Sequence, residues 1–365
     1  MASRWLWALG WSVWVWSGLA YAGEVAFVHK SSDGFSLAGK LAYPTGTTDA
    51  NAARVVILIH GSGPQGMDSD LSAASAGKPN CFFCDIRDGL VKKQFVVLRY
   101  NKRSFEINQL AAKDKNYVKG PAFKAFMENP LKYFVDDARG LVQWAQKKMP
   151  KAKIYLAGFS QGTYIALQVA EQEKAVAGVA VTGFYASTLE TISHEQIIHR
   201  PLYWFRSVDK NNDGLLDPSE LMQAGAVGLS LAAQGPALDA DGDGKISFME
   251  IQGGNYINML KFQRMLRANT LQELRYPRVD QILERLKIPV IFFQGMWDNQ
   301  TLAYHALSIR ILAQYIWKKN NFRFFFFPKL GHILDKRDRF DDLVYRRIEA
   351  SALEKLGSEM AALFK

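Results

Sequence analysis

The segment Lys153-Ile-Tyr-Leu-Ala-Gly-Phe-Ser-Gln-Gly162 decides the fold. Its first half is a short apolar run typical of a buried strand, and a helix-like run, 163–174, follows it. A strand, tight turn and helix of this pattern expose the hydroxyl of Ser160 at the end of the strand. The strand and helix cross at the turn, so the flanking positions must lack bulk, and both are glycines, Gly158 and Gly162. The pattern predicts that Ser160 is a nucleophile, and a plain structural turn is the alternative.

Two backbone amides near this turn are predicted to hold a developing negative charge. The amide of Gln161 lies at a helix N-terminus, where N–H groups point outward. A glycine-rich loop, His60-Gly-Ser-Gly-Pro64, follows the apolar run 54–59, which reads as a strand buried on both faces. We expect Ser62 to supply the second amide from this loop, with the neighbouring glycines as alternatives, and we expect His60 to orient the loop.

Two later strand ends supply an acid and a base. The apolar run 289–293 leads to Asp298, and the run 322–327 leads to His332. Loops that follow parallel strands meet at one edge of a sheet, so both side chains can approach Ser160. A histidine titrates near neutral pH and can take the serine proton, while an aspartate fixes its tautomer. The competing side chains are Asp335 for the acid and, for the base, His29, His60, His194, His199 and His305.

The segment from about 183 to 289 interrupts this alternation and contains two acidic twelve-residue loops. The loops, 209–220 and 239–250, both fit D-x-[DN]-x-[DN]-G-x5-E. Calcium takes about six to eight oxygen ligands, and glycine at position six permits the sharp turn. We also expect Leu216 and Ile246 to pair across the loops. The predicted ligands of two calcium ions are Asp209, Asn211, Asp213, Leu215, Asp217 and Glu220 in the first loop and Asp239, Asp241, Asp243, Lys245, Ser247 and Glu250 in the second.

The N-terminus reads as an export signal. A single positive charge, Arg4, precedes the apolar stretch 5–19, and Ala20-Tyr-Ala22 is a cleavage site that would leave Gly23 first. The stretch is shorter than the roughly 20 residues of a membrane span, and no later stretch qualifies. The sequence therefore predicts an exported protein, periplasmic or secreted, without a stable membrane span.

Two cysteines, Cys81 and Cys84, form a C-x-x-C pair. In an exported protein such an even pair predicts a local disulfide. A redox-active pair and half of a zinc site are the alternatives.

Composition sets broad limits. The chain has 365 residues, 48% of them hydrophobic, which permits two domains or one large α/β domain with an insertion. Lys and Arg number 45 against 35 Asp and Glu, a net charge of +10. The basic residues are scattered, which favours a solvated basic surface over nucleic-acid binding.

These motifs resemble the serine α/β-hydrolase superfamily, near its exported esterase, acyl-hydrolase and dienelactone-hydrolase-like branches. The resemblance rests on His60-Gly-Ser-Gly-Pro64, Leu98-Arg-Tyr-Asn-Lys-Arg103, Gly158-Phe-Ser-Gln-Gly162, Gly295-Met-Trp-Asp298 and Gly331-His332. It implies an α/β fold with a mostly parallel central sheet, helices on both faces and a helical lid that carries an EF-hand pair. Dienelactone hydrolases proper use a cysteine nucleophile, whereas this chain has Ser160.

The predicted organisation is a signal peptide, 1–22, a hydrolase core, 23–183 and 285–365, and a helical cap insertion, 184–284. The predicted function is an exported, calcium-binding serine hydrolase that cleaves a small-molecule carboxylic ester through an acyl-enzyme, with calcium ordering the cap. A serine peptidase or acyltransferase on the same triad is one alternative. A calcium-binding interaction protein with a vestigial triad is another.

Overall fold

The structure is a computed structural model that describes residues 21–364. The predicted signal peptide, 1–22, lies outside the described residues except for its last two. Every helix in the described range is too short or too polar to cross a membrane.

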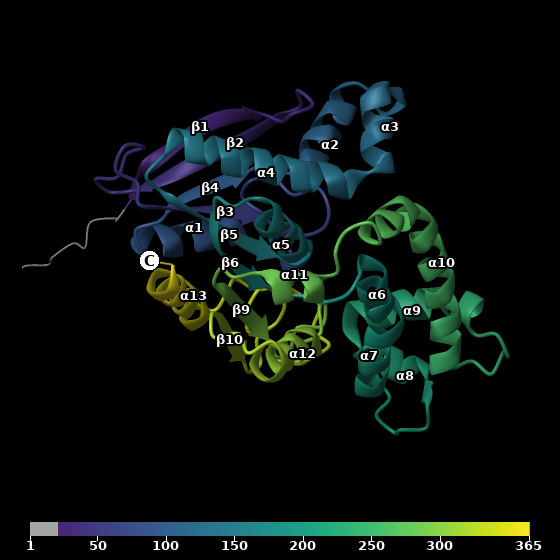
Figure 1. Ribbon diagram of the computed structural model, residues 1–365. Coiled ribbons are helices and arrows are strands. Elements are labelled where there is room, and N and C mark those ends of the chain that lie inside the picture. The colour runs from purple at the N-terminus through teal and green to yellow at the C-terminus, as the bar shows by residue number, and fades with distance from the viewer. Residues whose placement is uncertain (1–20, 365) are drawn as a thin grey trace, which may run out of the picture.

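An eight-stranded sheet forms the centre of the described chain (Figure 1). Its order is β1-β2-β4-β3-β5-β6-β9-β10. The pairs β1–β2 and β2–β4 are antiparallel, and the remaining pairs are parallel, as predicted. The strand bounds are Tyr21–Lys30 (β1), Ser36–Pro44 (β2), Arg54–Ile59 (β3), Val96–Tyr100 (β4), Lys153–Phe159 (β5), Val176–Thr182 (β6), Val290–Gly295 (β9) and Phe322–Phe327 (β10).

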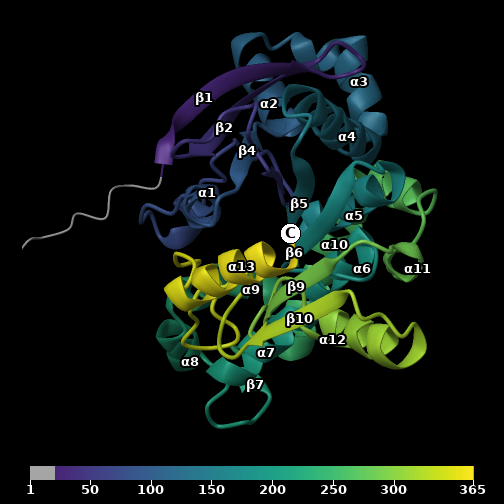
Figure 2. The ribbon, with the colours of Figure 1, turned by 60° about the vertical axis from the view of Figure 1, so that its left-hand side comes forward.

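Helices cover both faces of this sheet (Figure 2). Successive side chains of a strand point to opposite faces, and in β3 Val55 and Ile57 join one core cluster while Val56 and Leu58 join the other. The first cluster contains side chains of α4 (Pro130–Lys148), α5 (Gln161–Gln172), α11 (Val279–Arg285) and α12 (Tyr304–Ile311), which continues as the π-helical turn η4 (Leu312–Ile316). The second contains side chains of α1 (Phe82–Lys92) and α13 (Ala350–Leu363).

A helical cap lies between β6 and α11, to one side of the sheet (Figure 1). It has a small apolar core of its own, which includes Phe205, Leu216 and Ile246. Its elements are α6 (Leu189–His194), the π-helical turn η3 (Glu195–His199), α7 (Arg200–Val208), β7 (Leu215–Leu216), α8 (Pro218–Gln223), α9 (Gly225–Leu238), β8 (Ile246–Ser247) and α10 (Phe248–Glu273).

The predicted boundary between residues 284 and 285 falls inside α11. Val279, Ile282 and Leu283 of this helix belong to the main core, so α11 packs with the sheet rather than with the cap. The cap helices themselves end at Glu273.

Three helices lie in segments to which the sequence analysis assigned no element. They are α2 (Arg103–Lys113), α3 (Pro121–Glu128) and α13. Proline at the first position of α3 suits a helix start, because its missing N–H is not needed there. Short 3₁₀ turns, η1 (Ala73–Ser75) and η2 (Tyr117–Lys119), complete the described elements.

Candidate active site

Ser160 occupies a strained turn between β5 and α5. Its backbone angles, φ 53° and ψ −124°, are rarely adopted by a residue with a side chain. A Cβ added at Gly158 would lie 2.4 Å from the carbonyl oxygen of Gly162, and one at Gly162 would lie 2.2 Å from that of Ile59. The predicted need for glycine on both sides of the serine is therefore confirmed.

Asp298 and His332 form a hydrogen-bonded pair on the loops after β9 and β10. His332 Nδ1 lies 2.9 Å from Asp298 Oδ2 and 3.0 Å from Oδ1. Asp298 is fully buried, and Thr301 donates to it from both its amide and its hydroxyl. Burial alone would raise the pKa of Asp298, but the neighbouring His332 and these hydrogen bonds hold that pKa below its ordinary value. The carboxylate is therefore charged at neutral pH.

Two of the competing side chains, Asp335 and His60, have other partners. Asp335 forms an ion pair with Arg337 at 3.0 Å. His60 is buried, and its Nε2 lies 3.1 Å from the carbonyl oxygen of Gly66. Burial lowers the pKa of His60 to about 3, so its ring is neutral and holds the loop, consistent with the role expected for it.

Ser160 and His332 line the same cavity, which has a volume of about 230 Å³. Ser62, one of the two predicted amide donors, also lines it. No hydrogen bond joins the Ser160 and His332 side chains in the described part of the chain, and such contacts are often loose before substrate binds. The structure thus gathers the predicted nucleophile and base around one cavity, with the acid behind the base.

Lys102 is a site residue to which the sequence analysis assigned no role. Its Nζ donates to the carbonyl oxygen of Gly61 at 2.5 Å and to Gln161 Oε1 at 2.9 Å. The side chain is 3% exposed, and Nζ lies 4.2 Å from the centre of the Phe134 ring. Burial lowers the pKa of Lys102 to about 7. Its sequence signals were its position two residues after a buried strand and its place in the 98–103 segment that carries the family resemblance.

The two acidic loops adopt the expected turns side by side. Gly214 and Gly244 have φ of 81° and 80°, and Leu216 pairs with Ile246 in the short β7–β8 ladder, as predicted. Glu220 and Glu250, at position twelve, fold back to accept hydrogen bonds from their own loops. The position-twelve carboxylate of each loop therefore lies against the first residues of its own loop.

The oxygen atoms of these loops fit a hard cation. Carboxylate oxygens of Asp239, Asp241 and Asp243 lie within 4.8 Å of one another. In the first loop Asp209 Oδ1 is buried without a hydrogen-bond partner. One feature competes with a cation: Lys245 Nζ lies 3.4 Å from Asp213 Oδ2, in the other loop.

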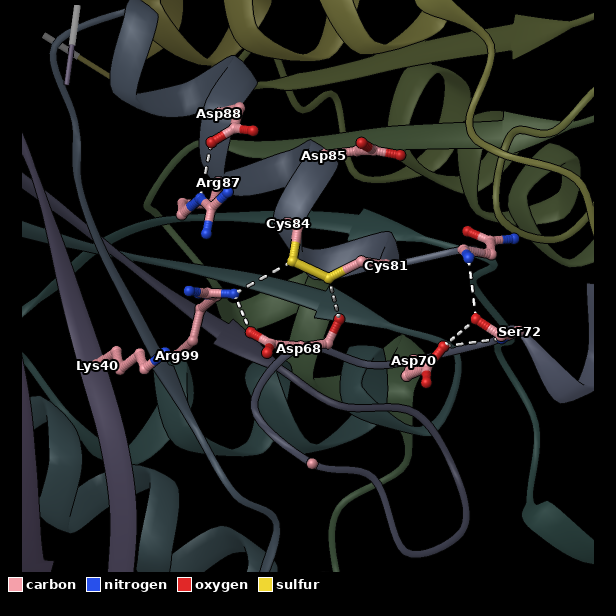
Figure 3. Close-up of a disulfide and its surroundings, with 12 residues drawn as sticks. Lys40, Asp68, Asp70, Ser72, Cys81, Cys84, Asp85, Arg87, Asp88 and Arg99 are labelled. Atoms are coloured by element: carbon pink, nitrogen blue, oxygen red, sulfur yellow. Dashed lines mark hydrogen bonds and ion pairs between the residues drawn. A yellow bond between two sulfur atoms is a disulfide. The ribbon is translucent and has the colours of Figure 1, made fainter. Parts of the chain in front are cut away.

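Cys81 and Cys84 lie at the start of α1 with their sulfur atoms at bonding distance (Figure 3). Cys81 Sγ lies 3.4 Å from the carbonyl oxygen of Asp68, and Arg99 contacts both Cys84 and the Asp68 carboxylate. This is the arrangement that the predicted disulfide requires. It would fix the first turn of α1, whose Phe82 lines the cavity.

Comparison with known proteins gives a matching family model, a similar esterase and solved structures with the same architecture. The family model described as "EF hand" matches residues 204–224 and 237–253. Esterase EstD of Thermotoga maritima is 30% identical over 177 residues, which is 48% of this chain but 37% of that protein. The match thus spans little more than a third of the relative's length.

Two solved structures share the architecture. An esterase from Pyrococcus furiosus superposes with a TM-score of 0.51 at 11% identity, covering 95% of this chain and 91% of that one. The acylaminoacyl peptidase of Pyrococcus horikoshii gives a TM-score of 0.50 at 14% identity, covering 94% and 41%. Identities this low establish a common fold and no more.

Proposed function

Because the chain has the α/β-hydrolase fold with an inserted EF-hand pair, we propose that it is a serine hydrolase that cleaves carboxylic esters. The observation that carries this proposal is the strained Ser160 on the cavity that His332 also lines, with His332 hydrogen-bonded to the buried Asp298. The likeness to Esterase EstD supports the ester as substrate.

In this proposal His332 Nε2 takes the proton as Ser160 Oγ attacks the acyl carbon. Nδ1 is already committed to Asp298, which fixes the tautomer and stabilises the imidazolium. The amides of Ser62 and Gln161 hold the oxyanion. His332 returns the proton to the alcohol oxygen as the ester C–O bond breaks. Water then attacks the acyl-enzyme in the same way, giving the carboxylic acid and free Ser160.

We further propose that each acidic loop holds one calcium ion through the six residues named for it. Calcium, when bound, supplies positive charge that offsets the repulsion between clustered carboxylates. Ordered loops would fix α7 and α10, which frame the cap. Export, cleavage before Gly23, the Cys81–Cys84 disulfide and the division into core and cap belong to the same proposal.

The direct test is hydrolysis of p-nitrophenyl acetate and butyrate by the chain 23–365, beside Ser160→Ala and the control Ser187→Ala. The proposal predicts that Ser160→Ala loses at least about a thousandfold in kcat and that Ser187→Ala keeps the wild-type rate. A folded wild-type protein that cleaves amides or transfers acyl groups but leaves esters intact would favour a peptidase or acyltransferase. A folded protein with no such activity would favour a calcium-binding interaction protein.

A further inference from the structure

Ser160 lies where two unequal cavities meet. The smaller, of about 230 Å³, is the one that Ser160 shares with His332. The larger, of about 620 Å³, extends from Ser160 beneath the cap, and Gln161 also lines it. An ester bound at Ser160 has an acyl chain on one side of the attacked carbon and an alcohol on the other. Each cavity can therefore hold one of these two parts.

The position of His332 determines which cavity holds the alcohol and which holds the acyl chain. His332 lines the smaller cavity and is absent from the described residues that line the larger one. The base must return its proton to the oxygen of the departing alcohol, so that oxygen has to lie on the side of His332. The alcohol therefore occupies the smaller cavity, and the acyl chain is left with the larger.

The larger cavity has the chemistry of an acyl site. Side chains of α2, α3, α4 and α6 line it, and they include Ile107, Phe126, Met127, Phe134, Leu189 and Ile192. Of the described lining residues, Lys102 alone carries a charge, and its ammonium already donates to Gly61 and Gln161. The wall thus suits a long apolar chain and offers little to a charged one.

The smaller cavity has both polar and apolar walls. Its lining includes Gln65, Ser69 and Tyr345 together with Leu71, Phe82, Phe159 and Ile333. Its volume leaves room for a short alcohol.

Resting on the proposed function, we propose that the substrates are esters of a large apolar carboxylic acid with a small alcohol, and that the cap cavity is the acyl site. Leu189 of α6 and Met127 of α3 then determine acyl specificity, and Leu71 determines alcohol specificity. Because α6 belongs to the cap, the inserted segment contributes directly to substrate choice.

The first test uses two isomeric esters, ethyl hexanoate and hexyl acetate, which differ only in the side on which the long chain lies. Each methylene buried from water is worth about fourfold in binding. The wild-type chain 23–365 should show kcat/KM at least about tenfold higher for ethyl hexanoate. A preference for hexyl acetate, or equal rates, would overturn the assignment.

The second test blocks each cavity in turn with the same substitution. Leu189 and Leu71 are both partly buried, so a tryptophan at either position can fill its cavity. Leu189→Trp should lower kcat/KM for ethyl hexanoate about tenfold more than it lowers kcat/KM for ethyl acetate. Leu71→Trp should do the same for hexyl acetate. The reverse pattern would overturn the assignment.

A circular dichroism spectrum and a melting temperature like those of wild type show that each variant is folded. If Leu189→Trp does not fold, Met127→Trp, at a side chain that is 46% exposed, carries the same prediction. The experiments distinguish failure of the proposed ester hydrolysis from failure of the cavity assignment. A folded wild-type protein that hydrolyses none of these esters would overturn the proposed function and the assignment with it, whereas hydrolysis without chain preference would overturn the assignment alone.

Discussion

The ammonium of Lys102 lies 2.5 Å from the carbonyl oxygen of Gly61, inside the core of the molecule. The same group reaches the side chain of Gln161, so it joins the two segments whose amides we assign to the oxyanion. A buried cation in this place costs stability. Its two hydrogen bonds indicate that it fixes the position of the Gly61 loop relative to Gln161.

Lys102→Met should therefore lower kcat without lowering stability. Methionine keeps much of the apolar volume but removes the donors to Gly61 and Gln161, which loosens the oxyanion amides. We expect kcat for p-nitrophenyl butyrate to fall about tenfold or more and the melting temperature to stay level or rise. Lys174→Met, at an exposed lysine, is the control. An unchanged kcat in Lys102→Met would contradict the positioning role.

Lys102 should also leave a signature in the pH dependence of stability. Its pKa is lowered from an ordinary 10.5 to about 7 by burial, so between these values the unfolded chain binds more protons than the folded one. The free energy of unfolding should rise with pH across this window, by at most about 1.4 kcal/mol per pH unit from this group. Urea unfolding at pH 7 and 9 should show a larger gain for wild type than for Lys102→Met. Equal gains would mean that Lys102 titrates normally.

Gly162→Ala should destabilise the protein strongly. Its Cβ would lie 2.2 Å from the carbonyl oxygen of Ile59, so β3 or α5 must move. We expect a loss of about 3 kcal/mol or more in urea unfolding. Gly253→Ala, in α10 where no atom lies within 4 Å of the added carbon, should cost nothing and can gain about 1 kcal/mol. Similar stability of the two variants would refute the steric argument.

Calcium should stabilise the cap through the two loops. Titration calorimetry of the wild-type chain should give two ions per molecule, and excess calcium should raise the melting temperature relative to EGTA. Glu250→Gln removes one charge from position twelve of the second loop and should weaken one site about tenfold or more. Glu349→Gln, outside the cap, is the matched control. A calcium response that Glu250→Gln leaves intact would place the ion elsewhere.

Much of the framework could be predicted because local signals and tertiary structure agree. The apolar run that became β3 matches its predicted bounds, and the glycines around Ser160 are dictated by two backbones that cross. The calcium loops carry a fixed spacing of ligands, so Leu216 and Ile246 could be paired in advance.

Other features depend on contacts that sequence does not encode locally. Nothing near Lys102 shows that its ammonium is buried against Phe134. The helix α11 follows the cap in sequence but packs on the sheet through Ile282. The larger cavity beside Ser160 is lined by helices that are distant in the chain, among them α3 and α6, so its size could not be predicted from either segment.

The most direct test of the central claim is labelling of the folded chain 23–365 with a small fluorophosphonate, followed by peptide mass spectrometry. The account predicts one adduct on Ser160, lost in His332→Ala through loss of the base and in Ser160→Ala through loss of the nucleophile. A folded wild-type protein that stays unlabelled at Ser160, or that is labelled at another serine, would contradict the account.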